Sequence, residues 1–76
     1  MKLTEREKEM LVMFGEFSRK ETLERLGAAC KLITDPDRKA VTCGLRYKVH
    51  KMDGRLYTRI YCRVKEEWNK YSGDAA

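Results

Sequence analysis

The single proline of this 76-residue chain limits what it can fold into more than any other residue. Pro36 follows Asp35, and the residue before a proline avoids the helical backbone conformation, so a helix is expected to end before this pair. Proline also suits the first position of a helix, and the carboxylate of Asp35 can cap that helix. We therefore expect a new element to begin at about residue 36.

Two capping patterns predict two helices upstream of this proline. Thr4 followed by Glu7 is a capping box, in which a hydroxyl and a carboxylate bind backbone amides at a helix start, and Ser18 with Glu21 repeats it. Apolar residues at helical spacing follow each box: Met10, Leu11, Phe14 and Phe17, then Leu23, Leu26, Cys30 and Ile33. Gly27 within the second helix indicates either a close helix approach or a locally weak helix.

Residues 41–71 fit two different structures. In the strand interpretation, Asp53-Gly54 is the type I′ turn of a β-hairpin that pairs residues 45–52 with residues 55–62. In the helical interpretation, the same two residues separate two apolar stripes: Val41, Leu45, Lys48/Val49 and Met52, then Tyr57, Ile60/Tyr61, Val64, Trp68 and Tyr71. The helical spacing continues beyond Val64, where the hairpin needs a change of period. We therefore predict an all-α, small four-helix bundle, with an α+β fold of two helices and a β-hairpin as the alternative.

The length of the chain allows one domain, residues 1–76, because chains of this size bury only about 60% of their unfolded surface. Stability should be marginal, so a partner or formation of a homodimer would help. The small, polar tail at residues 72–76 is expected to fray. The expected core residues are Leu11, Phe14, Leu23, Leu26, Ile33, Leu45, Ile60 and Trp68.

The beginning of the chain is charged, and the longest apolar run, Met10 to Phe14, is far shorter than a bilayer span. We therefore expect a cytoplasmic protein without a membrane segment. Cys30, Cys43 and Cys62 are 13 and 19 residues apart, which is unlike the short spacing of zinc and redox motifs. They are expected to be reduced, partly buried thiols without a metal or cofactor; a zinc site completed by His50 is the alternative.

Positive charge is concentrated in residues 38–63, which contain eight basic residues and one acidic residue, whereas residues 1–37 contain seven basic and eight acidic residues. Basic side chains bind phosphate oxygens, and exposed tyrosines can stack on unpaired bases. The segment therefore predicts a surface for nucleic acid or another polyanion. Its candidate residues are Arg46, Lys48, Lys51, Arg55, Arg59, Arg63, Tyr57 and Tyr61.

Other functions stay open for this basic segment. It could dock on an acidic protein surface as an inhibitor or adaptor, or be a solvated face, and the chain could be an obligate oligomer with a structural role. A helix-turn-helix fits poorly, because Asp35 and Asp37 would place carboxylates where phosphates should lie. We expect no enzymatic activity, since the chain has one histidine, no glycine-rich phosphate loop and no closely spaced Cys-His pair.

Short stretches of the first fifty residues are similar to stretches of a known group of proteins: Leu3 to Glu7 leading to Phe14-Gly15, Thr22-Leu23 with Leu26, Asp35-Pro36, and Leu45 with Lys48-Val49. In these stretches the chain resembles small, uncharacterised accessory proteins encoded on bacterial mobile elements such as conjugative transposons. The resemblance implies a helical bundle with an accessory or regulatory role, and it transfers no functional residue.

Overall fold

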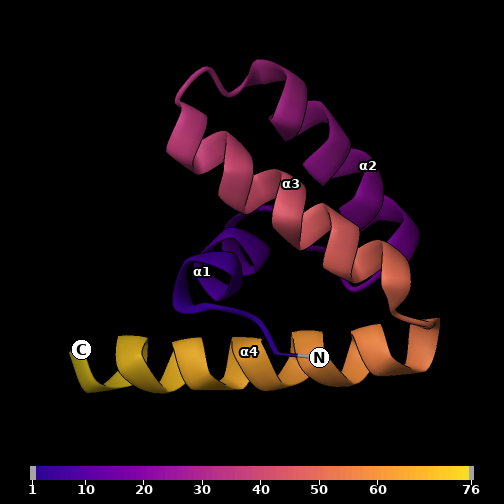
Figure 1. The fold of residues 1–76 in the computed structure, drawn as a ribbon. Coiled ribbons are helices and arrows are strands. Elements are labelled where there is room, and N and C mark those ends of the chain that lie inside the picture. The colour runs from indigo at the N-terminus through magenta and orange to yellow at the C-terminus, as the bar shows by residue number, and fades with distance from the viewer. Residues whose placement is uncertain (1, 76) are drawn as a thin grey trace.

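The computed structural model describes the backbone of residues 2–75 and the side chains of residues 2–70. Within that range the chain forms four α-helices and no β-strand (Figure 1): α1 (Glu5–Phe14), α2 (Arg19–Leu32), α3 (Pro36–Lys51) and α4 (Gly54–Ala75). The predicted all-α, four-helix fold is confirmed, and the β-hairpin alternative is wrong. No helix in this described part of the chain has the length and apolar composition needed to cross a membrane.

The helices begin at the predicted caps. The Thr4 hydroxyl accepts a hydrogen bond from the Glu7 amide at 3.2 Å, and the Glu7 carboxylate accepts one from the Thr4 amide at 2.8 Å. At the second helix only half of the predicted box forms: Ser18 Oγ accepts a long bond of 3.4 Å from the Glu21 amide. Asp35 caps α3 by accepting from the amide of residue 37 at 3.2 Å. All three helix starts therefore lie where the capping residues predict them.

The Asp53-Gly54 pair starts a helix and does not form a hairpin turn. Asp53 Oδ1 accepts a hydrogen bond of 2.7 Å from the amide of Leu56, as the cap of a helix does. A type I′ turn would need positive φ angles at both central residues, and no residue in the described part of the chain has one. Carboxylate capping thus explains why the helical interpretation holds here.

The helices pack as an α2–α3 hairpin, with α1 placed between this hairpin and α4. α2 and α3 are neighbours joined by the short connection 33–35, and they share the most extensive contact among the described helices. α1 lies between α3 and α4, which diverge from their junction at residues 52–53 (Figure 1). The buried core is formed by Leu11, Leu26, Leu45, Val49, Met52, Tyr57 and Val64.

The predicted core is only partly correct. Leu11, Leu26 and Leu45 are buried, but Phe14, Leu23, Ile33 and Ile60 are half-buried, and Trp68 is 37% exposed. α2 turns Thr22, Leu26 and Ala29 inward, so Leu23 and Cys30 lie at the margin of the core. α4 continues through residues 72–75 of the tail that was predicted to fray; the side chains from Tyr71 onward and residue 76 lie outside the described part.

Arg19, in the first turn of α2, holds the C-terminal end of α3. Its guanidinium group donates to three backbone oxygens: Nε to Val49 and Met52, at 3.3 and 2.9 Å, and Nη2 to His50 at 2.9 Å. A positive charge is favourable at the negative end of a helix dipole, where carbonyls lack the full set of helical amide partners; of these three, that of Val49 also accepts from the Met52 amide at 3.1 Å. This contact fixes the position from which α4 departs.

Candidate nucleic-acid interface

Three arginines of α4 form an exposed row, which we call the α4 arginine ridge: Arg55, Arg59 and Arg63. Successive members are four residues apart, so the ridge extends for about 12 Å along the helix. The inward face of α4 carries Tyr57 and Val64, which are buried. None of the three arginines forms an ion pair with any of the side chains in residues 2–70. The structure thus leaves three cationic groups on the side of α4 that faces away from the core.

The two predicted stacking residues do not lie beside this ridge. Residues two apart in a helix are about 200° apart around its axis, so Tyr57 and Tyr61 face the opposite side from Arg55 and Arg59. Tyr57 is fully buried and Tyr61 is half-buried, and their rings stack with centroids 5.8 Å apart. Tyr57 therefore has no exposed surface on which a base could stack, which corrects its assignment as a binding residue.

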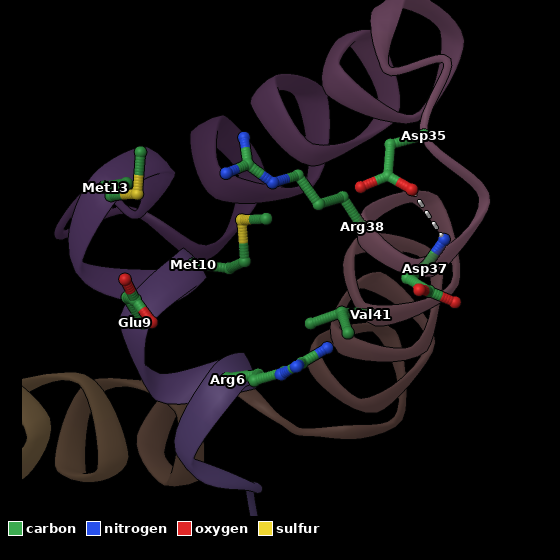
Figure 2. Close-up of a pocket in the computed structure, with 8 residues that line it drawn as sticks. All are labelled: Arg6, Glu9, Met10, Met13, Asp35, Asp37, Arg38 and Val41. Carbon is green, nitrogen blue, oxygen red and sulfur yellow. Dashed lines mark hydrogen bonds between the residues drawn. The ribbon is translucent and has the colours of Figure 1, made fainter.

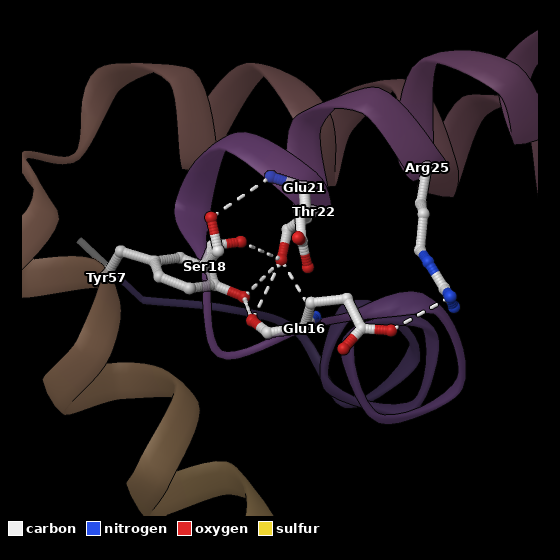
Figure 3. Close-up of polar contacts among 6 residues, drawn as sticks. All are labelled: Glu16, Ser18, Glu21, Thr22, Arg25 and Tyr57. Carbon is white, nitrogen blue, oxygen red and sulfur yellow. Dashed lines mark hydrogen bonds and ion pairs between the residues drawn. The ribbon is translucent and has the colours of Figure 1, made fainter.

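The hydroxyl of Tyr57 belongs to a buried polar network (Figure 3). It donates to the backbone oxygen of Glu16 and contacts Thr22 Oγ1, both at 2.5 Å. Thr22 Oγ1 also accepts from the Glu16 amide at 2.9 Å and lies 3.0 Å from the Ser18 oxygen. Burial is the main reason that the pKa of Tyr57 rises to about 12, so the phenol keeps its proton at neutral pH. The network ties α4 to the α1–α2 connection.

Lys48 also has a structural partner. Its ammonium group lies 2.6 Å from Oε1 of the buried Glu7 and donates to the backbone oxygen of Lys2 at 3.0 Å. Burial opposes the charged form of Glu7, but the hydrogen bonds from Lys48 and Thr4 and the positive charge of Lys48 outweigh it, so the pKa of Glu7 lies below its usual value of 4.5. The charge of Lys48 is therefore compensated inside the protein.

Arg46 and Lys51 are exposed, but they contact neighbouring groups on α2 and α3. The guanidinium group of Arg46 lies over Gly27 of α2, where an added Cβ would be 3.4 Å from Nε. Lys51 Nζ lies 5.4 Å from the centre of the Tyr47 ring. Since α3 and α4 diverge (Figure 1), Arg46 belongs to the α2–α3 side of the molecule. The predicted basic segment is thus divided between two helices.

A groove of about 440 Å³ lies between α1 and the start of α3 (Figure 2). Both signs of charge line it: Arg6 and Arg38 are accompanied by three carboxylates, and the apolar part is formed by Met10, Met13 and Val41. The three carboxylates are Glu9, Asp35 and Asp37. This mixture does not favour a polyanion, so we do not include the groove in the candidate interface.

The cysteines are arranged in a way that their spacing did not predict. Cys30 Sγ and Cys43 Sγ are 2.9 Å apart, on α2 and α3, while Cys62 lies on α4. All three are free thiols, and only Cys30 is partly buried; Cys43 and Cys62 are exposed, contrary to expectation. The side chains in the described residues include no group of three or more His, Cys, Asp or Glu that could hold a metal ion. The structure thus pairs two of the thiols and separates the third.

Sequence reasoning missed the groups that hold the helices together. The sequence pattern assigns Glu7 only to a capping box and gives no role between helices to Arg19 or Thr22, although each makes a contact between helices. The one available signal is that Thr22 lies four and seven residues before Leu26 and Ala29, with which it shares the inward side of α2.

No protein-family model, no curated protein and no solved structure matches this chain.

Proposed function

We propose that this chain is a small, non-enzymatic module that binds nucleic acid through the α4 arginine ridge. The observation that supports this most is the row of three exposed guanidinium groups without a carboxylate partner in the described residues. Guanidinium groups bind phosphate oxygens through two parallel hydrogen bonds, and release of the counterions that cover the phosphates supplies affinity. The resemblance to accessory proteins of mobile elements agrees with such a role and suggests a regulatory one.

The proposed contact is with the phosphate backbone and not with bases. The contact set is the ridge itself, Arg55, Arg59 and Arg63, whereas Lys51 lies on α3 over the Tyr47 ring. Tyr57 is buried and cannot stack on a base. Phosphate contacts alone carry little sequence information. We therefore expect weak affinity, micromolar or weaker, that depends strongly on salt and little on sequence.

A second candidate is docking of the same ridge on an acidic protein surface. It is favoured by Leu56, a large apolar side chain of α4 that is 37% exposed and lies seven residues before Arg63, on the ridge side of the helix. Protein interfaces commonly combine arginine with aromatic and apolar residues. Binding to an acidic polypeptide instead of an oligonucleotide would select this candidate.

The test compares two triple variants that each remove three positive charges. One replaces Arg55, Arg59 and Arg63 by Gln, and the control replaces Lys20, Lys31 and Lys39 by Gln, which are exposed and lie on α2 and α3. Fluorescence anisotropy with a labelled oligonucleotide is measured from low to high salt. We expect the ridge variant to reduce the slope of log affinity against log salt by about two to three units, and the control to change it by less than one.

Two results would overturn the proposal. One is absence of oligonucleotide binding by the wild-type chain at low salt, where the electrostatic contribution is largest. The other is an equal loss in both variants, which would show that net charge acts without a defined surface. In either case the variants should be compared on poly-glutamate, which tests the acidic-protein candidate with the same pair of proteins.

A further inference from the structure

The paired thiols Cys30 and Cys43 join the two helices that pack most extensively. Their sulfur atoms are 2.9 Å apart, whereas a disulfide bond is about 2.05 Å long, so the atoms need to approach by roughly 0.9 Å to bond. Cys30 lies in the last turn of α2, and Cys43 lies in the first half of α3. The folded chain therefore already holds these two sulfurs together across 12 intervening residues.

The two thiols differ in exposure, which assigns different roles to them. Cys43 is exposed and Cys30 is half-buried. Burial, followed by the hydrogen bond and charge of Cys43, raises the pKa of Cys30 to about 11, although Arg46 and Lys39 act in the opposite direction. An attacking sulfur must be accessible and ionised. Cys43 is accordingly the thiol that reacts first, and Cys30 is the one that follows.

Cys43 also lines a groove that can receive a small reactant. The groove has a volume of about 420 Å³, and its other walls are Leu23, Arg46, Tyr47 and His50. Arginine, histidine and tyrosine can bind the carboxylates of a small anionic thiol compound. The groove therefore offers room and complementary charge next to the exposed sulfur.

We propose that Cys30 and Cys43 are a redox-active dithiol that reacts with a low-molecular-mass disulfide and closes to an intramolecular disulfide between α2 and α3. The Cys43 thiolate attacks one sulfur of the small disulfide, which forms a mixed disulfide and releases one small thiolate. Cys30 loses its proton and attacks Cys43 Sγ, which forms the protein disulfide and releases the second thiolate. Two electrons pass to the small disulfide, and the two protons of the protein thiols are taken up by the released thiolates.

Closure of this bond would stabilise the helical hairpin. It forms a covalent ring from residue 30 to residue 43, which contains the α2–α3 connection and reduces the freedom of the unfolded chain. Small thiols in excess reverse the reaction, so stability would follow the thiol–disulfide balance. This inference does not depend on the proposed binding of nucleic acid.

The test exposes the folded full-length chain to glutathione disulfide and measures its intact mass and disulfide-linked peptides. We expect one linked peptide pair containing Cys30 and Cys43 with the loss of two hydrogen atoms from that pair, at most a mixed disulfide on the exposed Cys62, and a rise in Tm of roughly 10 °C that dithiothreitol reverses. In denaturant the selectivity should disappear, because all three thiols are then equally accessible and Cys62 also pairs.

Two single variants complete the test. Cys62→Ser removes the thiol on α4 and should behave like the wild-type chain. Cys30→Ser should instead stop at a stable mixed disulfide on Cys43, because the second thiol is missing. Mixed disulfides on Cys43 and Cys62 in the folded wild-type chain, without a Cys30–Cys43 linked peptide, would overturn the proposal, and this result does not depend on the folding of any variant.

Discussion

α3 and α4 both carry rows of basic residues, but the protein uses them in opposite ways. On α3, Lys48 is paired with the buried Glu7, and Arg46 covers Gly27 of the neighbouring helix. On α4, Arg55 and Arg59 face solvent without an ion pair in the described residues. A similar density of basic residues therefore contributes to packing between helices on α3 and forms a solvent-facing surface on α4. Partners across the helix interface, which the local sequence does not contain, make the difference.

The largest expected effect is on stability when the α3 ion pair is broken. Lys48→Met keeps the length of the side chain but leaves the Glu7 carboxylate buried without its cation. Breaking a buried pair in this way costs about 3–5 kcal/mol, and because the Lys48 side chain is 28% exposed, we expect about 2 kcal/mol. Urea denaturation should show a lower midpoint with an unchanged slope.

The matched change on α4 is Arg59→Met, which removes an exposed charge of the ridge. We expect the free energy of unfolding to change by less than about 0.5 kcal/mol, while the affinity for the oligonucleotide at low salt falls. Equal stability losses in the two variants would contradict the distinction between α3 and α4.

A smaller effect is expected from the inward face of α4, where Tyr57→Phe removes only a hydroxyl. The change leaves the Glu16 carbonyl and Thr22 with one fewer partner in a buried site, which costs about 1–2 kcal/mol. Thermal unfolding followed by circular dichroism measures the loss. Binding of single-stranded DNA by the folded variant should be unchanged, because the ring is fully buried. Weaker DNA binding with unchanged stability would mean that Tyr57 does contact the nucleic acid.

The features that sequence reasoning predicted correctly are local ones. Thr4, Ser18 and Asp35 lie at the helix starts because a cap depends on residues within one turn. The continued helical spacing beyond Val64 also decided correctly between helix and hairpin.

The features that it missed depend on which face of a helix meets which neighbour. In a helix Tyr57 cannot lie on the side of Arg55 and Arg59, so the predicted surface that contains all three fits only the alternation of a strand. The approach of Cys30 to Cys43 depends on how α2 crosses α3, which their separation in sequence does not indicate.

Apart from the nearly neutral Arg59→Met, the smallest expected change in stability comes from Gly27, which lies under Arg46, and it tests how firmly that arginine is held against α2. A Cβ at position 27 would lie 3.4 Å from Arg46 Nε, which is ordinary van der Waals contact. Since alanine favours a helix over glycine by up to about 1 kcal/mol, Gly27→Ala should stabilise the protein by about 0.5–1 kcal/mol in urea denaturation. Gly15→Ala is the matched control with the opposite sign, because its Cβ would clash with the Leu11 carbonyl oxygen and lie 3.1 Å from the Tyr61 ring. Destabilisation by Gly27→Ala would mean that Arg46 cannot move by even a few tenths of an ångström, and that its role in packing α3 on α2 is more rigid than its exposed position indicates.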